Sequence, residues 1–255
     1  WGRDPEAYIN GSSGYKCKDA YLYANGKTQN MVAGGLAMDP THPAIKERIR
    51  ETAERFKRLG YEYIKIDFLT HGCAEADYYY DPEVQTGMQA YNKGMAYLLE
   101  QMEGMYITMA ISPLFPSQYA HSRRIACDAW AGIGDTEYTL NSLTYGWWLN
   151  QVYTYNDPDH LLLEPVSDGE NRARITSGVI TGIFMNGDDL SCISGIQVAK
   201  DKARKFLTNK DINAIAKMGK SFRPVSGNMD GADFLFMHDT GKEVYLAAFN
   251  YSGYD

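Results

Sequence analysis

The feature that most constrains the fold is an alternation of helix-like and strand-like segments along most of the chain. Residues 40–60 carry apolar side chains at helical spacing, with Thr41 as the expected cap, Pro43 in the first turn and Gly60 at the end. The run 61–68 that follows is rich in Tyr and Ile, which favour strands. A helix that leads directly into a strand is one half of a crossover unit, in which helices connect parallel strands.

This alternation continues to about residue 218. We expect further strands at 106–112, 124–130, 152–156 and 182–186, and helices at 84–103, 136–150, 169–181 and 196–218. Five strands separated mostly by helices predict an α/β fold with a parallel sheet, either a barrel or a doubly wound sheet. Residues 1–39 are rich in Gly, Asn and Tyr and predict a long loop.

The pattern changes after Arg223-Pro224. Residues 232–239 and 243–252 both favour strands, and Thr240-Gly241-Lys242 between them predicts a hairpin turn. No helical segment separates these two strands. We therefore expect two parts, a catalytic α/β part at 1–222 and the start of an antiparallel β domain at 223–255.

Composition excludes several classes of partner and site. Lys and Arg number 25 against 32 Asp and Glu, a net charge of −7 without a basic stripe, which argues against nucleic acid. No apolar run is long enough to predict a membrane span. We expect no cofactor and no metal, because the His and Cys residues form no HxH, HExxH or CxxC pattern. The alternative is a metal site at His160, which lies beside two Asp residues.

The cysteines leave two alternatives open, free thiols throughout or one disulfide between Cys17 and Cys73. The chain begins at Trp1 without a Met or a signal-like segment. The compartment therefore stays open, with an extracytoplasmic one favoured. The oligomeric state is not predicted.

The informative feature for function is where the acids stand. Asp67 ends the first strand, Asp128 lies in the third, Asp157 follows the fourth, and Asp188-Asp189 close the fifth. The carboxyl ends of parallel strands converge on one face, where α/β barrels carry their chemistry. Two facing carboxylates are what glycoside hydrolysis requires, and the competing interpretation is that these acids are caps and turn residues.

Basic partners accompany two of these acids. Lys65 lies two residues before Asp67, on the same side of the strand, and Arg124 lies four residues before Asp128. A cation so placed favours the ionised carboxylate and can bind sugar hydroxyls. A purely structural ion pair is the alternative. Trp130 could stack on a sugar, whereas the Trp147-Trp148 pair is more typical of a core.

Five ordered segments resemble the α-galactosidase clan, clan D, glycoside hydrolase families 27 and 36. They are Met38-Asp-Pro-Thr-His-Pro43, Tyr63-Ile-Lys-Ile-Asp-Phe68, Arg124-Ile-Ala-Cys-Asp128, Tyr155-Asn-Asp-Pro-Asp-His-Leu-Leu-Leu163 and Asn186-Gly-Asp-Asp-Leu-Ser191. The resemblance implies a (β/α)8 TIM barrel followed by a C-terminal antiparallel β-sandwich. It also implies a retaining glycoside hydrolase that acts on an oligosaccharide or glycoconjugate.

Roles for individual residues follow from the resemblance alone. Asp67 would be the nucleophile and Asp128 the general acid/base. Lys65 and Arg124 would contact the sugar or order the acids, and Asp157 would shape the pocket.

The segments match strands four to eight of the barrel, so we expect the sequence to be part of a longer protein. Ile111-Ser-Pro-Leu-Phe115 lacks the Glu or Ser that recognises the sugar's 2-position in some members. Galactose, N-acetylgalactosamine and arabinopyranose therefore all stay open as the sugar. The alternatives in function are an α-N-acetylgalactosaminidase, a transglycosylase of the same clan, or a non-catalytic carbohydrate-binding barrel.

Overall fold

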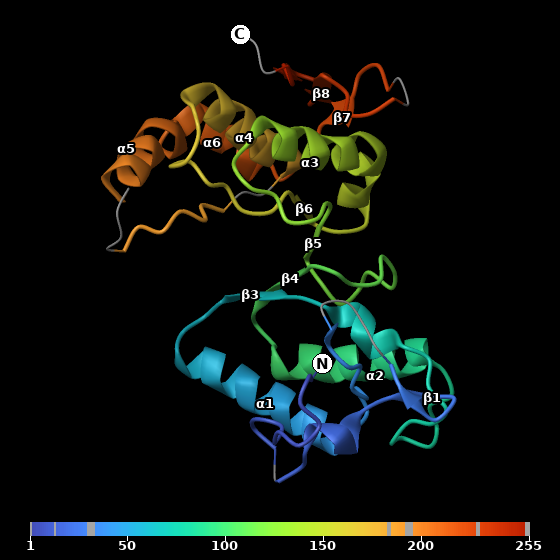
Figure 1. Ribbon diagram of the computed structural model, residues 1–255. Helices are drawn as coiled ribbons and strands as arrows, with labels where there is room; N and C mark the ends of the chain where they lie inside the picture. The colour runs from blue at the N-terminus through green and yellow to red at the C-terminus, as the bar shows by residue number, and fades with distance from the viewer. Residues whose placement is uncertain are drawn as a thin grey trace. The chain divides into compact units, whose positions relative to one another are not determined.

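A computed structural model describes residues 2–12, 14–29, 34–182, 185–191, 196–227 and 230–252 (Figure 1). The chain divides into two compact units, unit 1 at Trp1–Ala120 and unit 2 at His121–Asp255. Each unit has its own helices, parallel strand pair and apolar clusters, and each is described by itself below.

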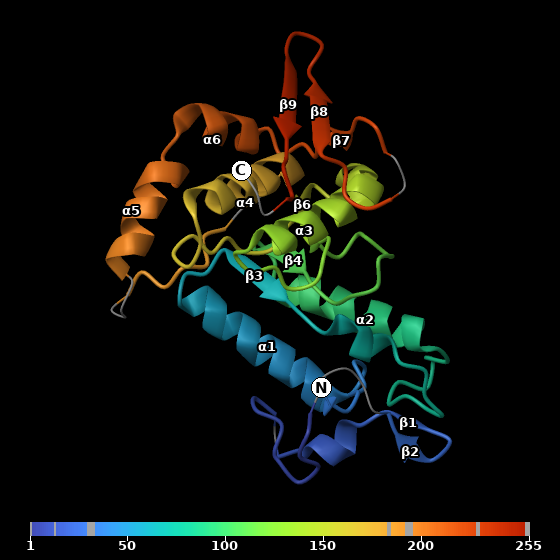
Figure 2. The same ribbon diagram turned by 45° about the horizontal axis from the view of Figure 1, so that its top comes forward.

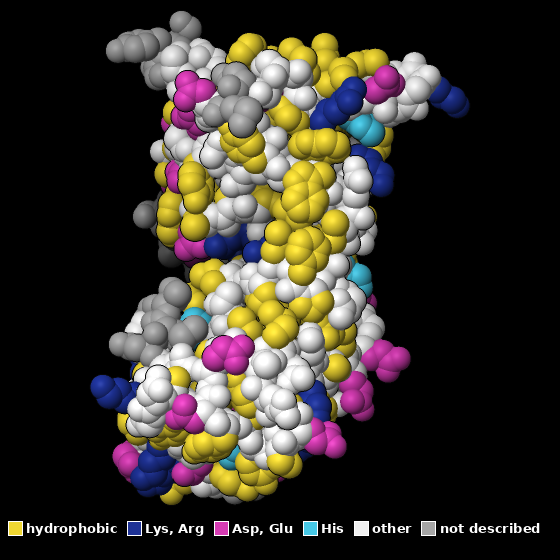
Figure 3. Space-filling view, turned by 90° about the vertical axis from the view of Figure 1, so that its right-hand side faces the viewer, with side chains coloured by type: hydrophobic (Ala, Val, Ile, Leu, Met, Phe, Trp, Pro, Cys, Tyr) yellow, Lys and Arg dark blue, Asp and Glu magenta, His cyan; other side chains and the backbone are white. Residues whose placement is uncertain are grey.

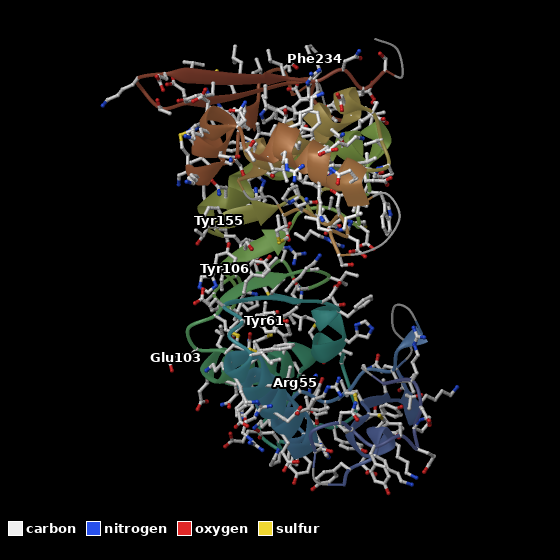
Figure 4. The ribbon with its side chains drawn as sticks, turned by 90° about the vertical axis from the view of Figure 1, so that its left-hand side faces the viewer. Arg55, Tyr61, Glu103, Tyr106, Tyr155 and Phe234 are labelled. Carbon is white, nitrogen blue, oxygen red and sulfur yellow. The ribbon has the colours of Figure 1, made fainter. Side chains whose placement is uncertain are left out.

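Unit 1 is built around one pair of parallel strands. Its elements are η1 (Cys17–Ala20), β1 (Tyr23–Ala24), β2 (Lys27–Thr28), α1 (Pro43–Arg58), β3 (Tyr63–Ile66), η3 (Leu69–Cys73), α2 (Gly87–Gln101) and β4 (Tyr106–Met109). β3 pairs with β4 in parallel, and the ring of Tyr106, labelled in Figure 4, stacks on Tyr63 at 5.4 Å. α1 and α2 lie on the same side of this pair (Figures 1 and 2). The predicted strand–helix–strand crossover is confirmed.

The start of α1 differs from the prediction in one residue. The N-cap is His42, whose Nδ1 accepts a hydrogen bond from the Ala44 backbone N–H at 3.2 Å. The expected cap, Thr41, instead donates its hydroxyl to the Asp39 carboxylate at 2.7 Å. The Thr41 hydroxyl oxygen also accepts a hydrogen bond from the Asp81 backbone N–H at 3.1 Å, so the hydroxyl is engaged away from the helix start. Gly60, at φ +79, follows the helix end as predicted.

Unit 2 contains a second parallel pair and a short antiparallel sheet. Its elements are β5 (Ser122–Arg124), α3 (Ile133–Gly146), η4 (Trp147–Gln151), β6 (Tyr155–Asp157), α4 (Asp168–Thr181), α5 (Ile196–Leu207), α6 (Lys210–Lys217), β7 (Arg223–Pro224), β8 (Leu235–Asp239) and β9 (Val244–Ala248). Within this unit α3 and α4 form a layer with β5 and β6 on one side and β7–β9 on the other (Figure 1). β5 and β6 are parallel, with Arg124 opposite Asp157.

The predicted hairpin is confirmed, and its inner face belongs to the core of unit 2. β8 and β9 pair antiparallel from Leu235↔Ala248 to Asp239↔Val244, and β7 adds a third strand against β8. Phe236 of β8 is fully buried in a cluster with Leu140 and Leu143 of α3 and Ile180 of α4. This shared core joins the β7–β9 sheet to the helical layer. Figure 2 shows β8 and β9 side by side, with the turn of the hairpin at the top.

Three predicted strands between residues 121 and 190 differ from the prediction. The strand expected at 124–130 is β5 at Ser122–Arg124, so Asp128 lies in the loop that follows it. The strand expected at 152–156 is β6 at Tyr155–Asp157, because the 3-10 turn η4 occupies the preceding residues. Of the strand expected at 182–186, residues 183–184 lie outside the described part, and Asn186 forms a parallel bridge with Leu161.

The cysteine alternatives are resolved for three of the four thiols. Cys17, Cys73 and Cys127 are free, so the Cys17–Cys73 disulfide is not formed. Cys192 lies outside the described residues. Among the helices that the structure describes, none is both long and apolar enough to cross a membrane.

The His42 cap predicts a pH dependence of stability. Burial lowers the pKa of His42, with Asp39 and Asp19 opposing the shift. A lowered folded-state pKa means that the unfolded chain takes up the proton first as the pH falls. The stabilisation is therefore complete above the ordinary His pKa of about 6.5 and is lost as the pH falls below it. In thermal melts between about pH 7.5 and 5.5, the wild type should lose more of its Tm than His42→Asn, which caps without titrating. Parallel pH curves for the two proteins would contradict this assignment.

Candidate active site

The first predicted acid, Asp67, lies in unit 1 directly after β3. Lys65 of β3 stands opposite Thr108 of β4, and Asp67 follows two residues later on the same side of the strand. Lys65 and Asp67 are exposed, whereas Ile66 between them is half-buried. The strand therefore presents a cation and a carboxylate together at its carboxyl end.

The backbone immediately after Asp67 is in an unusual conformation. Phe68 is left-handed at φ 58 and ψ 32, and its N–H donates to the Asp67 carboxylate at 2.7 Å. A non-glycine residue in this region costs about 1–3 kcal/mol, and such strain clusters at functional sites. The His71 N–H donates to the Phe68 carbonyl at 3.3 Å and helps to hold the turn. The chain therefore bends sharply at the residue after the candidate nucleophile.

A cavity of about 440 Å³ lies in unit 1 and includes Lys65 and Asp67 in its lining. Most of its wall consists of apolar side chains from the two helices, among them Ile45 and Ile49 of α1 and Leu98 of α2. A pyranose presents hydroxyl groups that need hydrogen-bond partners. The apolar wall is therefore typical of space between helices and a sheet, and we do not place the sugar there.

The second predicted acid, Asp128, lies in unit 2 and is bound to Arg124. The Arg124 side chain is only 5% exposed, and its Nη2 donates to Asp128 Oδ1 at 2.7 Å. Its Nε donates to the Ala126 carbonyl at 2.9 Å, which fixes the plane of the guanidinium. The Asp128 side chain is 67% exposed. The buried cation therefore fixes the orientation of a carboxylate that still reaches solvent.

A buried carboxylate, Asp159, forms the other side of this cluster. It is 1% exposed, its Oδ2 lies 3.4 Å from Arg124 Nη1, and it accepts a hydrogen bond from the Ala129 N–H at 3.0 Å. Asp157 beneath it is fully buried, and its Oδ1 accepts from the Asp159 N–H at 2.8 Å. Asp157 therefore supports the turn with a buried side chain, and its role in shaping the sugar pocket stays a prediction.

Arg174 of α4 holds the turn that carries Asp159. Arg174 is fully buried and its Nη2 donates to the carbonyls of Pro158 at 2.7 Å and His160 at 2.9 Å. Burial lowers the pKa of Arg174, and the negative charges of Asp159, Asp135 and Asp157 oppose that shift. The negative charges of these three acids thus partly offset the burial of the Arg174 cation.

Aromatic and acidic neighbours complete the surface of the cluster. Trp130 is 58% exposed and its ring lies 5.8 Å from that of His160, edge to face. Asp188 accepts from the backbone N–H groups of Leu163 and Glu164, so this acid caps a loop. The Asp189 carboxylate accepts a hydrogen bond from the Ser191 backbone N–H at 2.8 Å. Only Trp130 among these offers an open apolar surface next to Asp128.

Two further observations concern ligands. Within the described ranges, no group of three or more His, Cys, Asp and Glu side chains is arranged to hold a metal ion. On the face drawn in Figure 3, Lys and Arg side chains are dispersed among acidic and apolar ones. That face offers no continuous basic patch for a phosphate backbone.

Several solved structures have a similar fold, although the sequence matches no known family model. A GH27 β-L-arabinopyranosidase from Geobacillus stearothermophilus is similar over 94% of this chain at a TM-score of 0.61 and 13% identity. An α-galactosidase from Thermus thermophilus, in complex with p-nitrophenyl α-D-galactopyranoside, is similar over 76% of this chain at a TM-score of 0.57 and 20% identity. A GH36 α-galactosidase from Geobacillus stearothermophilus is similar over 86% of this chain at a TM-score of 0.57 and 14% identity.

The fold of the chain is similar to that of these GH27 and GH36 enzymes, which belong to clan D. The resemblance that the sequence motifs indicate is thereby confirmed at the level of the fold. The chain spans 56%, 43% and 31% of the lengths of these three proteins. All three are named as enzymes that act on sugars.

The structure brings some predicted site residues together and adds one. Arg124 and Asp128 form one cluster with Trp130 nearby, and Lys65 and Asp67 share one strand end in the other unit. Asp159, in contact with Arg124, was missed by sequence reasoning. A lone Asp after Pro is typical of a turn, and the signal that could have found it is its position two residues past Asp157 at the end of a parallel strand.

The role of Arg174 predicts a specific loss of stability. Arg174→Gln removes a buried cation that satisfies two carbonyls and balances neighbouring acids, so unfolding in urea should become easier by about 3–5 kcal/mol. Arg172→Gln, on the exposed side of the same helix, is the control and should change stability by less than about 0.5 kcal/mol. Equal effects of the two substitutions would show that the turn does not depend on Arg174.

Proposed function

We propose that the chain carries strands four to eight of the catalytic (β/α)8 barrel of a retaining glycoside hydrolase that removes terminal α-galactoside-like residues. In this proposal β3, β4, β5 and β6 are strands four to seven, and the segment at Asn186 is the eighth. The barrel part spans 1–222, and β7–β9, within 223–255, begins a C-terminal β-sandwich. The shared fold of the sugar-active neighbours supports this arrangement.

The observation that carries the proposal is the contrast among three acids of unit 2. Asp157 and Asp159 are buried and hydrogen-bonded to backbone N–H groups, as structural carboxylates are. Asp128 instead projects from the cluster, held by the buried Arg124 and 67% exposed. An oriented carboxylate that reaches solvent is what a general acid/base requires, because it must approach a substrate oxygen.

The chemistry follows a double displacement. Asp67 attacks the anomeric carbon while Asp128 donates its proton to the departing oxygen, which leaves a covalent glycosyl-enzyme. Asp128, now ionised, then removes a proton from water, and that water displaces Asp67 with net retention. Lys65 supplies a positive charge at the same strand end as the attacking carboxylate.

Sugar recognition is proposed for the surface around Asp128. The exposed ring of Trp130 offers an apolar face for the C–H groups of a pyranose. Lys65 is positioned at the strand end to donate to sugar hydroxyls. The substrate class is an oligosaccharide or glycoconjugate.

The nucleophile is tested by Asp67→Asn in the full-length protein. The substitution keeps the shape and removes the attacking charge, so turnover of aryl α-galactosides should fall by more than about 10³-fold with an unchanged Tm. Glu62→Gln, an exposed carboxyl just before β3, is the matched control and should retain full activity. Full activity of Asp67→Asn would remove the assignment.

The panel of aryl glycosides also separates the alternative functions. A folded wild type that binds sugars but cleaves none of them would be a non-catalytic carbohydrate-binding barrel. Transfer to added sugar in preference to water would identify a transglycosylase, since both compete for the same intermediate. A preference for N-acetylgalactosaminides would identify that specificity.

The acid/base is tested by Asp128→Ala. Loss of the proton donor should cost roughly 10²- to 10⁴-fold with alkyl α-galactosides and much less with nitrophenyl ones, whose departure needs no proton. Azide should restore turnover of the nitrophenyl substrate, because an anionic nucleophile needs no base. Glu164→Gln, exposed in the same unit, is the control. An equal loss with both leaving groups would count against Asp128 as the proton donor.

A further inference from the structure

Three nitrogen atoms converge on the buried Asp159 carboxylate. The Ala129 N–H donates to Oδ2 at 3.0 Å, Arg124 Nη1 lies 3.4 Å from the same oxygen, and His160 Nδ1 lies 3.3 Å from Oδ1. The side chain is 1% exposed. The backbone hydrogen bond and the ion pair with Arg124 together hold this buried carboxylate in one orientation.

The backbone at Asp159 is itself held in a specific conformation. Asp159 has φ +71, in the left-handed region that non-glycine residues rarely occupy. Its N–H donates to Asp157, and Arg174 donates to the carbonyls on either side of it. These contacts hold the carboxylate against β5 and the loop that follows it, where Arg124 and Ala129 lie.

Two of the three groups that contact the Asp159 carboxylate are also neighbours of Asp128. Arg124 donates Nη2 to Asp128 and points Nη1 at Asp159, so one guanidinium is shared by an exposed and a buried carboxylate. Ala129, whose N–H Asp159 accepts, is the next residue after Asp128. Asp159 therefore fixes the side-chain partner of Asp128 and the backbone beside it.

We propose that Asp159 is a positioning residue that holds Arg124 and the Ala129 backbone so that Asp128 is presented to the substrate. This inference rests on the proposed function of Asp128 as general acid/base. It also has an electrostatic consequence. Because Asp159 shares the charge of Arg124, the cation does not pair with Asp128 alone.

The geometric test needs no activity. Crystal structures of the wild type and of Asp159→Asn are compared in the full-length protein. The amide can no longer pair with Arg124, so the Arg124 Nη2–Asp128 Oδ1 contact or the Ala129 backbone should shift. If both stay in place in the variant, the positioning role is wrong, whatever reaction the protein performs.

The kinetic test uses a double-mutant cycle with alkyl and nitrophenyl α-galactosides. Asp159→Asn should lower kcat about tenfold or more for the alkyl substrate, with little change in KM. The loss should not exceed the roughly 10²- to 10⁴-fold that general acid–base catalysis supplies in total. The alkaline limb of its pH–rate profile should move to lower pH. In an Asp128→Ala background the same substitution should cost almost nothing, because the group that it positions is gone. If Asp159→Asn lowers kcat in the Asp128→Ala background as much as it does in the wild type, its role is purely structural and the proposal is overturned.

Controls separate this inference from the proposed function. Asp201→Asn, an exposed aspartate paired with Arg204, should behave as the wild type. If the wild type cleaves no glycoside but Arg124 moves in Asp159→Asn, the glycosidase proposal fails and the positioning of Asp128 stands. If Asp159→Asn does not fold, Asp159→Glu keeps the charge and displaces the carboxylate by one methylene; the proposal predicts the same loss of kcat, and unchanged kcat overturns it.

Discussion

The parallel register of β5 and β6 is the constraint on which the candidate site depends. Parallel pairing sets Arg124 opposite Asp157, so the residues that follow both strands emerge at the same edge. The Ile125 N–H donates to the Asp157 carbonyl at 3.0 Å and extends the ladder by one step. From that point the loop after β5 and the turn after β6 run close together. Arg124, Asp128 and Asp159 meet because of this register, although 30 residues separate Ala129 from Asp159.

The cluster at this edge divides the roles of its charges by burial. Arg124 and Arg174 are buried cations, and Asp157 and Asp159 are buried anions that accept from backbone N–H groups. Leaving any one of them without its partners would be costly, because an uncompensated buried charge destabilises a protein strongly. Asp128 is the member whose side chain is mostly exposed, at 67%. A rigid buried network that ends in one exposed carboxylate is suited to proton transfer, because the reacting group is oriented before the substrate arrives.

Sequence patterns could predict the elements whose signals are local. α1 was identified by its Pro43 and Gly60 boundaries, and the β8–β9 hairpin by Gly241 at its turn. Pro fixes the backbone φ, and Gly permits the positive φ that both glycines adopt here. The short strands were misplaced. β5 has three residues, and Ser122-Arg123-Arg124 has no apolar pattern, so only pairing with β6 defines it. The candidate acids were found from their order along the chain, but Asp159 was not, since its role comes from contacts made across that pairing.

The proposed double displacement requires that Asp67 becomes covalently bound to the sugar. The most direct measurement is mass spectrometry of peptides from full-length protein incubated with a fluorinated α-galactosyl fluoride, which slows the second displacement. The account predicts one added glycosyl group, located on the peptide that carries Asp67 and absent from Asp67→Asn. A label on any other residue, or turnover to a product of inverted anomeric configuration, would contradict it.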